Sequence, residues 1–261
     1  MTRQQEHDRA RRRWEKRRSA LAQRDAQRAR TRRLLAVVAS VVAVALALWG
    51  LGAAFAPDPE PGQVTAAGCA LPPAALGTGA QLELPDKATA AGRTYSATLS
   101  TNCGDVVLEL DGAAAPQAVA SFVQLARADY WRNAPCHRLL AAEEATLLQC
   151  GDPTGTGQGT PGYGYGVENA PEDGVYPRGT VAMARTSDPA KGNGGQFFLV
   201  AQQTRLPDAD GYTIFGKVIE GLGIVDKIVA AGVAPGGQSS TDGAPAAPLS
   251  ILRVAVIEKK A

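Results

Sequence analysis

The sequence predicts a mainly β fold, a closed barrel or sandwich of many short strands with two helices, behind an N-terminal transmembrane helix. Two observations favour this class. The 261 residues include 29 Gly and 17 Pro, which separate short apolar segments along the second half of the chain. Residues 34–56 contain no charged residue, which indicates a membrane-spanning helix.

The charge of the chain is divided between two regions. The 27 basic and 25 acidic residues give a net charge of only +2, so nucleic-acid binding is not expected. Residues 1–33, however, hold 13 Lys and Arg against four acidic residues, a charge of +9, and the rest of the chain carries −7. We interpret residues 1–33 as a cytoplasmic arm near anionic lipid, where each basic group contributes about 1 kcal/mol to membrane attraction.

The uncharged segment 34–56 is 23 residues long. As a helix it would span about 34 Å, enough for the hydrocarbon core of a bilayer. Cleavage as a signal peptide is the alternative, since Ala54-Phe55-Ala56 has the form of a cleavage site. We favour a retained anchor because the apolar segment and the basic region before it are both long. The positive-inside rule then places the N-terminus in the cytoplasm and the rest outside the cell membrane.

Residues 57–93 are interpreted as a linker, because six prolines interrupt any helix or central strand. One cysteine, Cys69, lies within it, and the other three are Cys103, Cys136 and Cys150. No C-x-x-C pair occurs, so a zinc site is not expected. Outside the membrane the four cysteines predict two disulfides, with three possible connectivities.

The remaining residues, 94–261, are predicted to form the folded domain. A hairpin is expected from β-forming segments at 95–100 and 106–110 around a turn at 102–105. Pro116 opens a helix whose apolar residues recur at helical spacing to about residue 128. Short strands, a second helix and a closing strand follow. The strands are expected at 137–140, 146–149, 179–184, 196–200, 213–218 and 249–257, and the helix at 224–230.

Two local motifs in this domain are weak signals of chemistry. Residues 157–162 fit G-x-G-x-x-G but are followed by more Gly instead of a helix, so a surface loop is preferred to a nucleotide site. Cys136 and His137 are adjacent, and neighbours on a strand point to opposite faces. A Cys–His nucleophile is therefore not expected.

Four ordered segments of the domain do resemble a known family. They are the sequence from Cys136 to Tyr163 containing C-H-R-L-L and L-L-Q-C-G-D-P-T-G-T-G-Q-G, then G-T-V-A-M-A at 179–184, N-G-G-Q-F-F at 193–198 and Y-T-I-F-G-K-V at 212–218. In order and spacing they resemble the cyclophilin family of peptidyl-prolyl cis-trans isomerases. The anchored, cysteine-containing layout resembles cyclophilins of high-GC Gram-positive bacteria.

The resemblance implies an eight-stranded antiparallel β-barrel capped by two helices. It also implies a monomeric enzyme that acts without cofactor or metal on proline-containing peptides and unfolded proteins. Rotation about an X–Pro bond faces a barrier of roughly 20 kcal/mol from amide resonance. A guanidinium aimed at the prolyl nitrogen would stabilise the twisted amide more than the planar one.

Site residues follow from motif positions. The resemblance makes Arg138 the catalytic guanidinium and gives Gln149 the role of bonding the substrate backbone and orienting Arg138. Phe198 would form the floor of the proline pocket, with Leu147 and Tyr212 as walls and Leu206 loosely matched nearby. The neighbouring subsite would be lined by Ala184, Arg185 and Gln196.

The chain also departs from the family pattern. Thr146 stands where the family usually has an aromatic residue, Arg185 where it has asparagine, and no tryptophan follows Trp131. The segment between Arg138 and Gln149 is longer than usual. These differences predict a shallower, less aromatic pocket, in which a lost wall aromatic removes roughly 1–3 kcal/mol of apolar contact.

The same residues bear on the disulfides. If Arg138 and Gln149 both face the substrate, Cys136 lies on the face of Arg138 while Cys150 lies opposite Gln149. A straight hairpin would not join these two cysteines, although a bulge from the inserted residues could reset the faces. The pairing is left open.

Two functions compete at this stage. The first is a membrane-anchored prolyl isomerase that assists the folding of secreted or surface proteins. The second is a proline-peptide-binding module or chaperone with weak or lost isomerase activity, which the departures from the family pattern motivate. A third hypothesis gives residues 1–33 a role in recruiting cytoplasmic partners.

Overall fold

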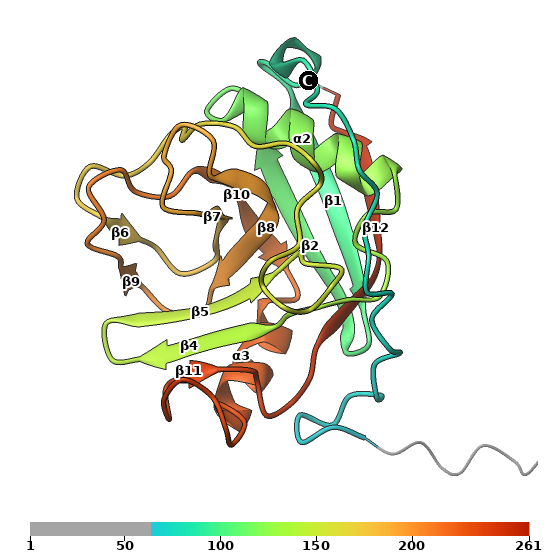
Figure 1. Ribbon diagram of the computed structural model, residues 1–261, viewed down its shortest axis with the longest axis vertical. Helices are drawn as coiled ribbons and strands as arrows, with labels where there is room; N and C mark the ends of the chain where they lie inside the picture. The colour runs from blue at the N-terminus through green and yellow to red at the C-terminus, as the bar shows by residue number, and fades with distance from the viewer. Residues whose placement is uncertain (1–63, 261) are drawn as a thin grey trace, which may run out of the picture. The chain divides into compact units, whose positions relative to one another are not determined.

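The computed structural model describes residues 64–260 of the chain (Figure 1). The predicted cytoplasmic arm at 1–33 and the predicted transmembrane helix at 34–56 lie outside these residues. Among the helices that are described, none has both the length and the apolar character needed to cross a membrane.

The described part is mainly β, as predicted. All eight predicted strand segments are confirmed in order, with ends that shift by three residues or fewer. The strands are β1 (Thr94–Thr101), β2 (Gly104–Asp111), β4 (Arg138–Ala142), β5 (Ala145–Cys150), β7 (Thr180–Arg185), β8 (Asn193–Val200), β10 (Ile214–Glu220) and β12 (Ser250–Glu258). Two helices, α2 (Pro116–Arg127) and α3 (Leu222–Ala231), match the predicted pair.

Short strands complete the sheet. In the order β11-β4-β5-β8-β7-β10-β2-β1-β12-β3, the two-residue strands β11 (Asp242–Gly243) and β3 (Ala134–Pro135) form the ends. The sheet is a curled antiparallel half-barrel. The eight long strands agree with the expected number of strands. The expected closed barrel is wrong, because the sheet has two ends, formed by the short strands β11 and β3. A separate pair is formed by β6 (Val175–Tyr176) and β9 (Thr204–Arg205).

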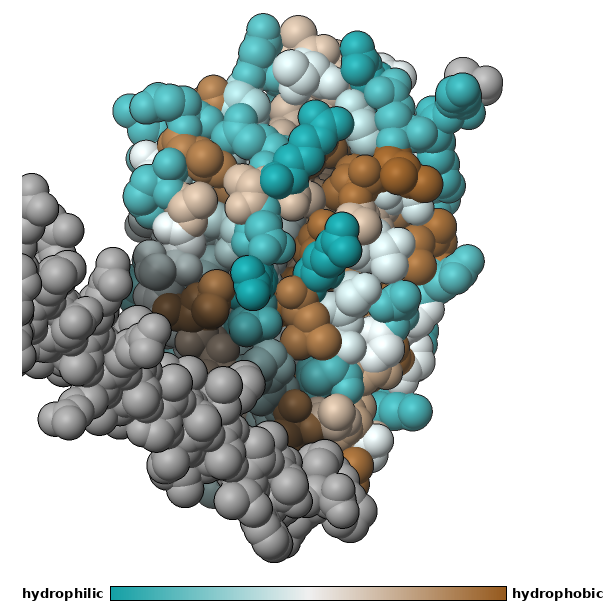
Figure 2. Space-filling view, turned by 90° about the vertical axis from the view of Figure 1, so that its right-hand side faces the viewer, coloured by the Kyte–Doolittle hydropathy of each residue, from teal (hydrophilic) through white to brown (hydrophobic). Residues whose placement is uncertain are grey.

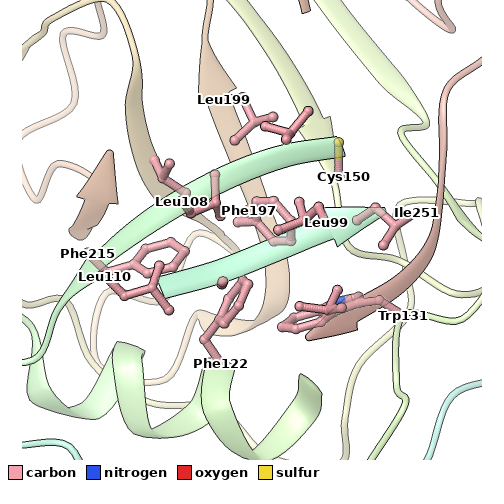
Figure 3. Packing of buried hydrophobic residues seen from close by; sticks show 14 of the residues in the cluster. Leu99, Leu108, Leu110, Phe122, Trp131, Cys150, Phe197, Leu199, Phe215 and Ile251 are labelled. Atoms are coloured by element: carbon pink, nitrogen blue, oxygen red, sulfur yellow. The ribbon is translucent and has the colours of Figure 1, made fainter. Parts of the chain in front are cut away.

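The main core lies between the sheet and α2 (Figure 3). Phe122 of α2 points into it, with its ring centre 4.5 Å from that of Trp131 and 5.7 Å from that of Phe197. Pro116 lies in the first turn of α2. Proline is tolerated there because backbone N–H groups of the first turn have no acceptor within the helix, so the N–H that proline lacks is not missed. The strands β1 and β2 bury alternate residues against this core, as their period of two requires.

The middle strands of the sheet are buried on both faces, because each sends alternate side chains to two different apolar clusters. One set belongs to the main core, and it includes Leu148, Val181, Phe197 and Leu199. Their neighbours form a second, smaller cluster on the opposite face, which includes Leu147, Ala182, Phe198 and Val200. The strands β5, β7 and β8 therefore carry the core on one face and the predicted site on the other.

The described part of the predicted linker, residues 64–93, runs along the sheet and over α2 (Figure 1). Its only regular element beyond an isolated bridge is a short 3-10 helix, η1 (Lys87–Thr89). The Cys69–Cys103 disulfide joins it to the β1–β2 turn. Two glutamines of α2 donate to its carbonyls, Gln117 to Pro85 at 2.9 Å and Gln124 to Glu83 at 2.8 Å. We call residues 64–93 the strap.

Figure 2 shows the face of the molecule along which the strap runs, which is the right-hand side of Figure 1. Apolar residues lie there in separate groups between polar ones. Six large hydrophobic residues of the described chain are exposed, four of them in the strap: Val64, Leu71, Leu76, Leu84, Ile219 and Ile257. Scattered apolar residues of this kind are normal on a water-facing surface.

Candidate active site

The predicted catalytic pair lies on one β-hairpin. Arg138 of β4 and Gln149 of β5 are direct cross-strand partners, so both side chains lie on the face of the second apolar cluster. Arg138 Nη1 is 3.4 Å from Gln149 Oε1. Gln149 in turn donates from Nε2 to Gln196 Oε1 at 2.9 Å. The structure thus brings together three residues that the resemblance assigns to the site.

The guanidinium of Arg138 has a further partner that the sequence did not predict. Asp242 of β11 accepts from Arg138 Nε and from Nη2, each at 2.7 Å. This two-point contact raises the pKa of Arg138 and lowers the pKa of Asp242, because each charge stabilises the other. The arginine therefore stays charged with its plane fixed.

A buried histidine adjoins this pair. Both ring nitrogens of His137 are buried and have no hydrogen-bond partner among the described residues. Burial is the main cause that lowers the pKa of His137. A neutral imidazole places no second positive charge beside Arg138.

The apolar part of the site is the second cluster. Phe198 of β8 is the cross-strand partner of Gln149, which sets its ring in the same row as the predicted catalytic pair. Phe198 is 3% exposed and Leu147 is 4% exposed. Tyr212 meets Phe198 edge-on with ring centres 5.7 Å apart, and Leu206 packs against the cluster. The four residues assigned to the proline pocket therefore lie together.

One aromatic wall was missed by the sequence analysis. Tyr176 of β6 is fully buried, and its ring centre is 6.1 Å from that of Phe198 and 6.3 Å from that of Tyr212. Its hydroxyl accepts from the backbone N–H of Tyr212 at 2.8 Å. The cluster thus has one more aromatic ring than the motif positions implied. The strand that carries Tyr176 has only two residues, too few for any periodicity in the sequence to signal this position.

Arg185 is folded onto the cluster instead of pointing into solvent. Its side chain is 4% exposed and forms an ion pair with Asp208. It also donates to the carbonyl of Gly211 at 2.8 Å, and its guanidinium carbon lies 5.0 Å from the centre of the Tyr212 ring. The long charged residue that replaces the family asparagine is thereby neutralised within the site.

A pocket of about 200 Å³ adjoins the cluster. Its lining includes Ala184, Arg185 and Gln196, which are the residues assigned to the neighbouring subsite. Gln196 Nε2 donates to the carbonyls of Gly157 and Gly159 at 2.9 and 3.1 Å. The glycine-rich loop is thus a wall of this pocket.

Asp152 holds that loop in place. It accepts from the backbone N–H of Gly157 at 2.6 Å, of Gly159 at 3.1 Å and of Thr154 at 2.8 Å. Burial opposes its charged form, but these bonds outweigh burial and leave the pKa of Asp152 lowered. The glycines of the G-x-G-x-x-G pattern therefore lie in a loop whose backbone N–H groups bind the carboxylate of Asp152.

The second disulfide joins Cys136 to Cys150, directly beside Arg138 and Gln149. Strand parity in a straight hairpin does not predict this bond, and a bulge among the inserted residues would be one way to allow it. The inserted residues instead form the tip of a regular hairpin, in which Ala142 pairs with Ala145. The strand β4 begins only at Arg138, so strand parity does not extend to Cys136.

No cluster of three or more His, Cys, Asp or Glu side chains suited to a metal ion occurs within residues 64–260.

Comparisons with known proteins agree with this geometry. Residues 96–256 match the family described as cyclophilin type peptidyl-prolyl cis-trans isomerase/CLD. A probable peptidyl-prolyl cis-trans isomerase B of Mycobacterium tuberculosis is 40% identical over 171 residues, which are 61% of this chain and 53% of that protein. The chain thus matches about half the length of this relative.

Two further similarities point the same way. A peptidyl-prolyl cis-trans isomerase of Helicobacter pylori is 40% identical over 139 residues, covering 52% of this chain and 81% of that protein. The crystal structure of a Cryptosporidium parvum isomerase of the same type, solved in the presence of the dipeptide Ala-Pro, is 29% identical with a TM-score of 0.51. It covers 63% of this chain and 99% of the solved one.

Proposed function

Because the chain belongs to the cyclophilin family of peptidyl-prolyl cis-trans isomerases, we propose that it catalyses rotation about X–Pro bonds in peptides and unfolded proteins. One observation carries this proposal. The guanidinium of Arg138 is held between Asp242 and Gln149 in the same row of side chains as Phe198.

The reaction needs a positive hydrogen-bond donor near the prolyl nitrogen and, beside it, a pocket that holds the proline ring. The barrier to rotation is roughly 20 kcal/mol and comes from amide resonance. As the bond twists, the prolyl nitrogen becomes a better hydrogen-bond acceptor. Arg138 then binds the twisted amide more strongly than the planar one, and each 1.4 kcal/mol of that difference speeds rotation about tenfold.

The remaining site residues hold the substrate. The apolar cluster of Phe198, Leu147, Tyr212 and Leu206 takes the proline ring. Gln149 offers its amide group to the backbone beside it, and the pocket lined by Ala184, Arg185 and Gln196 takes a preceding side chain. With the proline side held, the other side of the bond is free to turn.

A proline-peptide-binding module with little turnover is the second candidate. It is favoured by the low exposure of the floor residue Phe198 and the wall residue Leu147, which are 3% and 4% exposed, and by the guanidinium of Arg185 over Tyr212. A cluster this closed limits how deeply a proline ring enters.

The proposed place of action is outside the cell membrane, with clients among secreted or surface proteins. Support comes from the sequence: the uncharged segment 34–56 follows a basic arm at 1–33, which predicts a single-pass anchor with the N-terminus in the cytoplasm. Both disulfides of the described domain are compatible with an oxidising compartment.

A protease-coupled assay on an X–Pro peptide tests the two candidates. We expect the wild type to accelerate isomerisation and Arg138→Ala to lose about 10²–10³-fold, as expected when a transition-state donor is removed. Arg178→Ala is the matched control, because its guanidinium also pairs with an aspartate, Asp226, on the surface. Peptide binding with turnover equal to that of Arg138→Ala would favour the binding module.

A further inference from the structure

Arg138 is held by a residue 104 positions away in the sequence. Both oxygens of Asp242 are engaged, one by Nε and one by Nη2, each at 2.7 Å. The side chain of Asp242 is only 18% exposed, against 40% for Arg138. A two-point contact between a planar guanidinium and a carboxylate defines the plane and direction of the arginine.

The donors of Arg138 can be counted. A guanidinium has five N–H groups. Asp242 takes the Nε–H and one Nη2–H, and Gln149 is placed to accept one Nη1–H. One N–H on each terminal nitrogen is left for substrate. The contact with Asp242 therefore turns a flexible side chain into a pair of directed donors.

Asp242 is itself fixed by its surroundings. Its strand β11 pairs with β4, placing Asp242 opposite Leu140 and Gly243 opposite Leu139. The carbonyl of Asp242 accepts from the backbone N–H of Ser239 at 3.0 Å. At Gly243 an added Cβ would lie only 2.7 Å from the Cα of Gly237, so the turn that carries Asp242 is closely packed.

We propose that Asp242 is the positioning residue of the catalytic guanidinium. It acts through Arg138 and does not touch substrate. Its negative charge weakens the field of the arginine, and the gain is orientation: Arg138 meets the twisted amide without first losing side-chain freedom. This inference rests on the proposed function, because it assigns Asp242 a part in the same reaction.

The test compares three variants of the full chain by exchange NMR over a range of X–Pro peptide concentrations up to saturation, which separates kcat from KM. Asp242→Asn is expected to lower kcat at least about tenfold while KM changes less than about twofold, because misplacement of a reacting group by ~1 Å can cost 10²-fold. Asp242→Glu, which keeps a two-oxygen acceptor, is expected to retain more kcat than Asp242→Asn. The Arg138 Nε–H signal should shift in Asp242→Asn.

Asp226→Asn is the control, because it breaks an equivalent two-point pair with Arg178, at 2.8 and 2.7 Å, on the surface near α3. It should leave kcat unchanged. An equal kcat in Asp242→Asn and wild type, or a higher one, would overturn the positioning role while leaving the proposed isomerase intact. A wild type without turnover would overturn both.

Discussion

At the residue scale, the site contains two arginines, Arg138 and Arg185, and each is neutralised by one aspartate. Arg138 pairs with Asp242 and keeps 40% of its side chain exposed, whereas Arg185 pairs with Asp208 and is 4% exposed. One guanidinium is therefore available to a substrate and the other is part of the wall. The difference follows from their partners, since Arg185 is also bonded to Gly211.

Replacement of Arg185 tests its structural part. Arg185→Asn restores the usual residue of the family but leaves Asp208 without its ion-pair partner and the carbonyl of Gly211 without its donor. We expect a loss of about 1–3 kcal/mol in the free energy of unfolding, measured by urea denaturation. Arg132→Asn is the control, because its pair with Asp129 spans 4.0 Å at exposed positions and should contribute almost nothing. Equal stability of the two variants would contradict the assignment.

The ion pair of Asp242 predicts a pH dependence. Arg138 lowers the pKa of Asp242 in the folded chain, so the unfolded chain, with an ordinary value of about 3.9, binds the proton more readily. The stabilisation is therefore complete above that value and is lost as pH falls through the lower, folded pKa. Melting temperatures of wild type and Asp242→Asn should differ at neutral pH and converge in acid. A constant difference down to about pH 2 would be inconsistent with this.

At the element scale, the β4–β5 hairpin carries the predicted catalytic pair, Arg138 and Gln149, and is joined at its base by Cys136–Cys150. The far end of the hairpin is held as well. The hydroxyl of Thr204 in β9 accepts from the backbone N–H of Thr146 at 2.9 Å. Thr146 stands where the family usually has an aromatic residue. Through its backbone N–H it links β5 of the large sheet to β9 of the two-stranded sheet. The hairpin is fixed at both ends, which favours a rigid site.

The two disulfides should differ in their effects. Replacing both Cys136 and Cys150 by serine should cost about 3 kcal/mol in the loop-entropy description and reduce turnover, because the bond adjoins Arg138 and Gln149. Replacing Cys69 and Cys103, which join the strap to the β1–β2 turn, should lower stability with little effect on turnover. Urea unfolding and the protease-coupled assay measure both. Equal turnover losses in the two variants would argue against the local role.

At the scale of the whole molecule, the near-neutral net charge of +2 conceals +9 in residues 1–33 and −7 elsewhere. The described domain belongs to the acidic part, and the strap fastens its N-terminal side through a disulfide and side-chain bonds. The first strand, β1, begins at Thr94, but the described residues before it pack on the domain as well, so the boundary at residue 94 stays a prediction.

The membrane proposal predicts a fractionation result. The full chain expressed in a high-GC Gram-positive host should remain in the membrane fraction after alkaline carbonate extraction, because 23 uncharged residues at 34–56 are long enough to span the bilayer. A chain starting at residue 57 should be soluble. A soluble product from the full-length gene whose N-terminus follows Ala56 would show cleavage as a signal peptide instead.

The sequence by itself determined the local elements of this protein. Period-two alternation and turn residues predicted eight strands in order, and Pro116 predicted the start of α2. Motif positions also identified site residues that the structure brings together on one face of β5, β7 and β8. The strands and helices depend on short-range sterics and on which side chains avoid water, both of which are present in a few neighbouring residues. The site residues followed instead from the resemblance to the family.

Tertiary structure alone decided which distant segments meet. The contact of Asp242 with Arg138, the ring of Tyr176 beside Phe198 and the Cys136–Cys150 bond all join residues whose own neighbours give no sign of the partner. Each depends on where strands such as β4 and β6 begin and which edges pair, and a shift of one residue would turn the side chains to the other face. The orientation of the predicted catalytic arginine is therefore a property of the folded sheet.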